Sequence, residues 1–244
     1  MNRQTKFYSA ALIFLSIIFA PAAAYRPFGV EDAGVAGRGV GQVEMSWDNL
    51  QWRNGDTEDI ILLAPILGVT DRLELSLEIP YMFHNPAGGG AQNGLGDINA
   101  VGKYLLYDEG PRLPAFALKG VVKTATGNKS AGLGSGDIDY SFIAVASKCL
   151  DRFVLHSMFG YTIMGKDGNS GIRNIFQYGI AADFKAAENL NLVFELAGYQ
   201  HPDRSVTDNP LYCLLGAILK ISDKVTADAG VRLGLTESAA VRDI

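Results

Sequence analysis

The sequence has few cysteines, few charged residues and no excess of basic residues. Of its 244 residues, two are Cys and three are His. Two cysteines cannot build a disulfide-stapled scaffold. Charged residues make up 19%, below the roughly 25% of an average soluble domain. Acidic residues outnumber basic ones 26 to 21, so the chain lacks the positive patch of a nucleic-acid binder, and we predict no nucleic-acid partner.

Long apolar runs are also scarce, and the one run that stands out lies near the N-terminus. Arg3 and Lys6 precede a mostly apolar segment at residues 8–20, and three alanines follow Pro21. This order is typical of a secretory signal peptide. The run is short of the about 20 residues of a membrane-spanning helix, so an anchor helix is the weaker alternative. We predict a signal peptide at residues 1–24, cleaved near Ala24, and one domain at residues 25–244.

Apolar and polar residues alternate along much of the predicted domain. Between residues 73 and 83 every second residue is apolar, whereas Glu74, Ser76 and Glu78 lie between them. A period of two indicates a strand with one apolar face. No long segment shows the 3.6-residue period of an amphipathic helix, so the predicted class is all-β.

We predict eleven strands, separated by connections that alternate between short and long. The long connections are rich in glycine and polar residues, and they all lie at one end of the sheet. This is the layout of an outer-membrane barrel. The strands are predicted at residues 39–52, 57–67, 72–83, 96–107, 114–126, 136–148, 152–164, 173–185, 191–201, 210–221 and 225–234.

Strand length distinguishes a membrane barrel from its soluble alternatives. Most predicted strands reach the about 9–11 residues of a tilted membrane-spanning strand, whereas soluble strands average about 5–6 residues. A soluble β-sandwich or lipocalin-like barrel remains the alternative, with its apolar faces inside. Tyr81, Tyr104 and Tyr161 lie near strand ends, as aromatic girdles do. The predicted fold is an antiparallel transmembrane β-barrel in the outer membrane of a Gram-negative bacterium.

The number of predicted strands is odd, whereas bacterial outer-membrane barrels have an even number. After the strand at 225–234, residues 241–244 have the pattern of a strand that is beginning. An unpaired strand edge in lipid costs several kcal/mol for each unsatisfied group. We therefore expect a barrel of about 12 strands, the last one truncated; imperfect closure is the alternative.

Several short motifs carry a family resemblance. They are Asp-Arg-Leu-Glu-Leu at 71–75, Ile-Pro-Tyr at 79–81, Gly-Leu-Gly-Asp-Ile at 94–98, Gly-Lys-Tyr at 102–104, Ala-Phe-Ala-Leu-Lys at 115–119, Thr-Gly at 126–127, Gly-Ser-Gly-Asp-Ile at 134–138 and Phe-Gly-Tyr at 159–161. In order and spacing they resemble the outer-membrane proteins named after the MetA pathway of phenol degradation. The resemblance implies a β-barrel with a suggested role in the uptake of apolar or aromatic compounds. It also implies a terminal strand with a final aromatic residue, which this sequence lacks.

The polar strand faces define candidates for the lumen. In a narrow lumen we expect such charges to pair across strands. They could form a salt-bridged plug or a charged constriction that selects solutes. Side chains fill a barrel of about eight strands, whereas about sixteen strands leave a water channel. A barrel of about twelve strands lies between these cases, so its width does not distinguish a plug from a constriction. The lumen-lining candidates are Glu44, Asp48, Glu74, Glu78, Lys103, Lys119, Lys123, Asp137, Asp139, Asp183, Glu195 and Arg232.

Signals for catalysis or cofactor binding are weak. The glycine-rich segments at 94–98 and 132–138 are not followed by Gly-Lys-Ser/Thr, so they do not predict a nucleotide site. His156 and Ser157 are adjacent, which places them on opposite faces of a strand and prevents a nucleophile–base pair. The other two histidines lack metal-ligand spacing. We predict no enzyme activity, catalytic residue, cofactor or metal.

The leading functional hypothesis is a channel for passive uptake of small, hydrophobic or aromatic compounds across the outer membrane. Its expected partners are outer-membrane lipid, the barrel-assembly machinery and small-molecule solutes. A closed structural or surface-interaction barrel is the second hypothesis, and a lipid-active enzyme of the outer membrane is the third.

Overall fold

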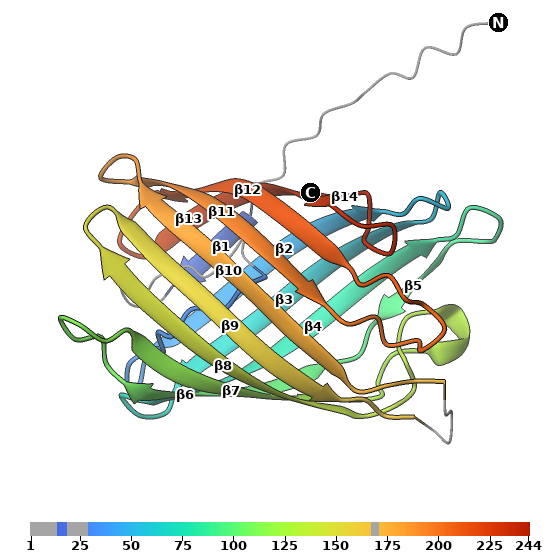
Figure 1. Cartoon of the computed structure of the whole chain (residues 1–244), viewed down its shortest axis with the longest axis horizontal. Helices are drawn as coiled ribbons and strands as arrows, with labels where there is room; N and C mark the ends of the chain where they lie inside the picture. The colour runs from blue at the N-terminus through green and yellow to red at the C-terminus, as the bar shows by residue number, and fades with distance from the viewer. Residues whose placement is uncertain (1–13, 19–28, 167–170) are drawn as a thin grey trace, which may run out of the picture.

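The computed structural model describes residues 14–18, 29–166 and 171–244. Within them, antiparallel strands pair in sequence order and wrap into a closed wall (Figure 1). Apart from residues 14–18, the predicted signal peptide lies outside the described residues.

All eleven predicted strands are confirmed, each within three residues at either end. They are β2 (Gly41–Gln51), β3 (Thr57–Gly68), β4 (Leu73–Asn85), β6 (Asn99–Tyr107), β7 (Ala115–Lys123), β8 (Asp139–Leu150), β9 (Phe153–Ile163), β10 (Ile175–Lys185), β11 (Leu190–Tyr199), β12 (Leu211–Lys220) and β13 (Val225–Gly234). From β3 onward the connections follow the predicted alternation, with short turns at one end and long loops at the other; the β2–β3 connection at the long-loop end is short. Among the described residues the fold is therefore all-β and antiparallel, as predicted.

Two short strands share the twelfth position of the barrel, between β13 and β2. The strand β14 (Arg242–Asp243) pairs with both neighbours at the long-loop end. The strand β1 (Phe14–Ile18) pairs with both at the short-turn end. The prediction that a strand begins in residues 241–244 is thus confirmed by β14. The strand β1 lies within the predicted signal peptide, and the cleavage predicted near Ala24 stays a prediction.

Two elements lie in connections that were predicted to be loops. The strand β5 (Gln92–Leu95) pairs with the end of β4, on the edge that β6 occupies nearer the start of β4. The 3-10 helix η1 (Lys129–Ala131) lies between β7 and β8 and is capped by the Asn128 side chain. Both are at the long-loop end, where glycine and polar residues are concentrated.

The apolar face of the wall points outward. On β9, for example, Phe153, Leu155 and Phe159 are exposed, whereas Gly160 and Thr162 are buried inside. A soluble sandwich or lipocalin-like barrel would have the opposite polarity, so the structure excludes both alternatives. An outward apolar band around a polar interior is the arrangement of a transmembrane barrel. No helix in the described part of the chain is long and apolar enough to cross a membrane.

Candidate lumen site

An N-terminal segment at residues 29–40 runs inside the barrel before β2 begins; we call it the lumen strap. Its backbone contacts inward-facing side chains from widely separated strands. The N–H of Val30 donates to Glu195 on β11 at 2.7 Å, and that of Ala33 donates to Ser147 on β8 at 2.9 Å. The N–H of Ala36 donates to Glu74 on β4 at 2.6 Å.

The backbone of the strap needs acceptors from side chains of the wall. The strap residues 29–36 form no regular secondary structure, so their buried N–H groups need other acceptors. Carboxylates on β4 and β11 and a hydroxyl on β8 supply them. The strap is therefore anchored on several sides of the lumen by single hydrogen bonds rather than by a strand ladder.

Small residues of the wall make room for the strap. Val30 and Ala33 are almost completely buried, and Val30 packs against Ala181 and Ala197. A Cβ atom at Gly179 would lie 2.5 Å from Cγ2 of Val30. At the other end of the strap, a Cβ atom at Gly68 would lie 2.0 Å from the carbonyl oxygen of Gly37. Glycine is required at both places because the strap approaches the wall so closely.

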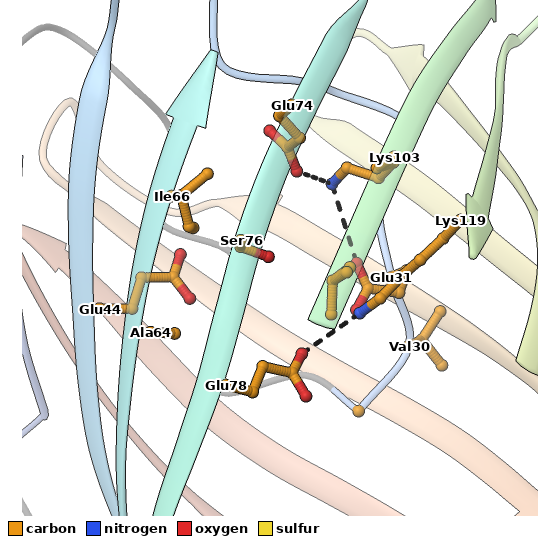
Figure 2. Close-up of a pocket in the computed structure, with 12 residues that line it drawn as sticks. Val30, Glu31, Glu44, Ala64, Ile66, Glu74, Ser76, Glu78, Lys103 and Lys119 are labelled. Atoms are coloured by element: carbon orange, nitrogen blue, oxygen red, sulfur yellow. Dashed lines mark hydrogen bonds and ion pairs between the residues drawn. The ribbon is translucent and has the colours of Figure 1, made fainter. Parts of the chain in front are cut away.

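Two lysines face each other in the wall beside the strap. Lys103 on β6 and Lys119 on β7 are directly opposite in the strand register, and both side chains are buried in the lumen. Like charges in this position destabilise a sheet. The carboxylate of Glu31 lies between them, in contact with the Lys119 ammonium and 3.8 Å from that of Lys103 (Figure 2).

Wall carboxylates complete this cluster. Glu74 lies opposite Lys103 in the register and 3.2 Å from its Nζ. Glu78 lies 3.5 Å from the Nζ of Lys119. The expected cross-strand pairing thus occurs, but a carboxylate of the strap joins it. Sequence analysis missed Glu31, because the strap shows no alternation that would mark it as part of the barrel.

A cavity of about 160 Å³ adjoins the cluster, between the strap and the strands β2 to β7. Its lining is mixed. Glu44 and Ser76 contribute polar atoms, and Ala64 and Ile66 contribute apolar surface (Figure 2). Val101 also lines the cavity. The site can therefore contact both a charged group and an apolar one.

Lys123 is the centre of a second cluster, at the long-loop end. Its Nζ lies 2.9 Å from Asp97 and 3.2 Å from Asp139, which is opposite it in the register. Asp97 also accepts hydrogen bonds from the N–H groups of Gly127 and Ser135, each at 2.9 Å. Burial raises the pKa of Asp97, but the bonds from Lys123, Ser135 and Gly127 outweigh it and hold that pKa below its ordinary value. Asp97 thus ties the β7–β8 loop to the barrel.

The remaining predicted lumen residues have separate partners. Arg232 forms an ion pair with Asp243 of β14 and stacks on Tyr212, 4.9 Å from the ring centre. Asp183 accepts from Asn191 at 3.0 Å, and Asp48 accepts from Ser46 at 3.3 Å. Asp137 lies before β8 in the connection from β7, 3.9 Å from Lys129.

Comparison with known families identifies the group to which this barrel belongs. The model of the family described as "Putative MetA-pathway of phenol degradation" matches residues 25–242. The chain belongs to this family. The resemblance carried by the sequence motifs is thereby confirmed for nearly all of the predicted domain.

Among solved structures, this family member is similar to an outer membrane channel from Pseudomonas putida F1. The TM-score is 0.63 at 12% identity, and the match covers 99% of this chain and 95% of that chain. At this identity the likeness concerns the fold. A comparison with curated proteins found no match.

The structure brings His156 and Ser157 to opposite sides of the wall. His156 faces the lumen, where its Nδ1 lies 2.8 Å from Ser147 Oγ. Ser157 faces outward, so the two do not form a nucleophile–base pair. Among the described residues, no group of three His, Cys, Asp or Glu side chains is placed to hold a metal ion.

Proposed function

We propose that this member of the phenol-degradation family is an outer-membrane channel for the passive passage of small molecules. The observation that carries the proposal is the polarity of the barrel, which is apolar outside and charged inside. Such a wall is stable in lipid only as a closed barrel, and a charged interior suits a path for solutes. Small hydrophobic or aromatic compounds are the proposed cargo, and this part rests on the family to which the chain belongs.

The lumen strap must move before a solute can pass through the barrel. It occupies the interior, but Val30, Ala33 and Ala36 are held by hydrogen bonds to side chains of the wall. Moving strap residues 29–36 breaks these contacts and the Glu31 ion pairs without unpairing any wall strand. We propose that solutes pass when the strap shifts away from the wall.

A closed barrel that acts through its surface loops is the second candidate. The burial of the strap favours it, because Val30 and Ala33 are packed as residues of a core are. Outer-membrane lipid and the barrel-assembly machinery are proposed partners in either case. The two candidates differ in whether small solutes cross the membrane.

Liposome swelling tests the channel directly. The protein, purified from outer membranes of cells that express the full chain, is reconstituted into liposomes and exposed to arabinose, glucose and sucrose. The proposal predicts swelling rates above those of protein-free liposomes that decrease with solute size. Rates equal to the protein-free control, for protein that migrates as a folded barrel, would favour the closed barrel.

A further inference from the structure

We propose that the Lys103–Lys119 pair is a binding site for the carboxylate of a small apolar acid. Glu31 is then a tethered occupant that such an acid displaces. The inference deepens the proposed channel function, because it gives the lumen a ligand class. It rests on the position of three charged side chains and on what surrounds them.

The two lysines are a built site rather than a solvated face. The side chain of Lys103 is 3% exposed and that of Lys119 is 10% exposed. Their strand positions are directly opposite, so the wall itself holds the two ammonium groups together. A buried ammonium group needs a compensating anion. Glu74 and Glu78 of the wall supply one carboxylate each, and Glu31 adds a third that is in direct contact with Lys119.

Glu31 differs from the other carboxylates of the cluster. Glu74 and Glu78 belong to β4 and remain in place whatever the strap does. Glu31 belongs to the strap and is closer to Lys119 than Glu78 is, at 3.5 Å. When the strap leaves, Lys119 loses its nearest carboxylate, and a carboxylate from solution can restore the charge-assisted hydrogen bond.

The surroundings of Glu31 define the rest of the ligand. The neighbouring strap residue, Val30, is buried against Ala181 and Ala197, beside Gly179. Departure of the strap therefore frees a carboxylate position and a compact apolar position at the same time. A small acid with a branched or aromatic body matches both.

The fixed carboxylates restrict the charge of the ligand. Glu74 and Glu78 balance one lysine each, and the wall carboxylate of Glu44 lines the same cavity, so Glu31 is a surplus carboxylate beside the two lysines. A monocarboxylate restores the charge that Glu31 brought. A phosphate dianion adds a further negative charge beside these carboxylates, and this disfavours it.

Fluorine NMR of the purified full-length protein in detergent tests the inference without ion flow. The probe is 4-fluorobenzoate, and the neutral control of similar shape is 4-fluorobenzyl alcohol. Glu31→Gln removes the tethered competitor and should tighten benzoate binding by about tenfold or more, a change of about 1.4 kcal/mol. Lys119→Met should abolish it, whereas Lys119→Arg and the distant Asp183→Asn should retain it.

The inference is overturned if Glu31→Gln binds benzoate no more tightly than the unaltered protein. It is equally overturned if the alcohol and the acid respond alike, or if inorganic phosphate binds as tightly as benzoate. The channel function stands or falls separately. Benzoate binding in a barrel that passes no solute contradicts only the channel, and solute passage without benzoate binding contradicts only this site.

Discussion

The fully buried carboxylate of Glu195 on β11 accepts the backbone N–H of Val30 at 2.7 Å. A residue of the membrane-spanning wall thus holds a segment that lies outside the sheet. The same relationship recurs where Glu74 accepts from Ala36. Inward-facing carboxylates of the barrel therefore hold the strap by its backbone.

Replacing Glu195 should loosen the strap locally. A hydrogen bond to a charged group contributes about 1.5–3 kcal/mol, so Glu195→Ala should accelerate hydrogen exchange of the Val30 amide by about 10- to 100-fold. The matched control is Asp183→Ala, which removes an inward carboxylate bonded to Asn191 rather than to the strap. Equal exchange rates in the two variants would contradict the role of Glu195.

Gly68 should tolerate no side chain. A Cβ atom there would meet the carbonyl oxygen of Gly37 at 2.0 Å, so Gly68→Ala must displace the end of the strap. Gly41→Ala, on the neighbouring strand, is the control because a Cβ there meets nothing within 4 Å. Limited proteolysis should cleave residues 29–40 faster in Gly68→Ala than in Gly41→Ala. Identical cleavage would mean that the strap does not lie against Gly68.

The order of the β7–β8 loop should depend on pH, because Asp97 holds this loop to the barrel. Its pKa lies below the ordinary value in the folded loop, so its contribution is present at neutral pH. The contribution is lost as the pH falls below about 3.9 and through the lowered pKa. A spin label at Ser130→Cys, with both native cysteines replaced by Ser, should become more mobile in this acidic window.

The control for this pH dependence is Asp97→Asn. The amide cannot form the charged contact with Lys123, so the label should be mobile at neutral pH and change little on acidification. A label that stays immobile from pH 7 to pH 2.5 with Asp97 present would refute the role of this carboxylate in ordering the loop.

The ion pair between Arg232 and Asp243 should hold β14 in the wall. Asp243→Ala removes the partner of a half-buried guanidinium and should destabilise the barrel by about 2 kcal/mol. Urea unfolding in detergent, followed by heat-modifiable gel migration, measures this. The adjacent Arg242→Ala serves as control, and an equal effect of both substitutions would show that the ion pair contributes nothing specific.

The wall of the barrel could be predicted from the sequence because period-two alternation is a local property. Phe153, Leu155 and Phe159 alternate with polar or small residues on β9, and the structure exposes them outside the wall. The start of a further strand at residues 241–244 was also predicted, and β14 lies there. In a membrane barrel both faces constrain the pattern, which explains why strand boundaries agree so closely.

The lumen strap could not be predicted in this way. Its contacts join residues far apart in sequence, such as Val30 and Glu195, and no periodic pattern marks them. The register that places Lys103 opposite Lys119 could not be predicted either, because it depends on the bulge near Leu105 and on the turn that follows. Glycines such as Gly68 were the available signal, and they are informative only once the strap is known.

The central claim is that the strap closes an otherwise open lumen. Single-channel recording in planar bilayers tests it most directly, comparing the unaltered protein with the double variant Glu31→Gln/Glu195→Ala. The account predicts small or rare conductance steps for the unaltered protein and larger, longer steps for the variant. A variant that migrates as a folded barrel but shows the same conductance as the unaltered protein would contradict it.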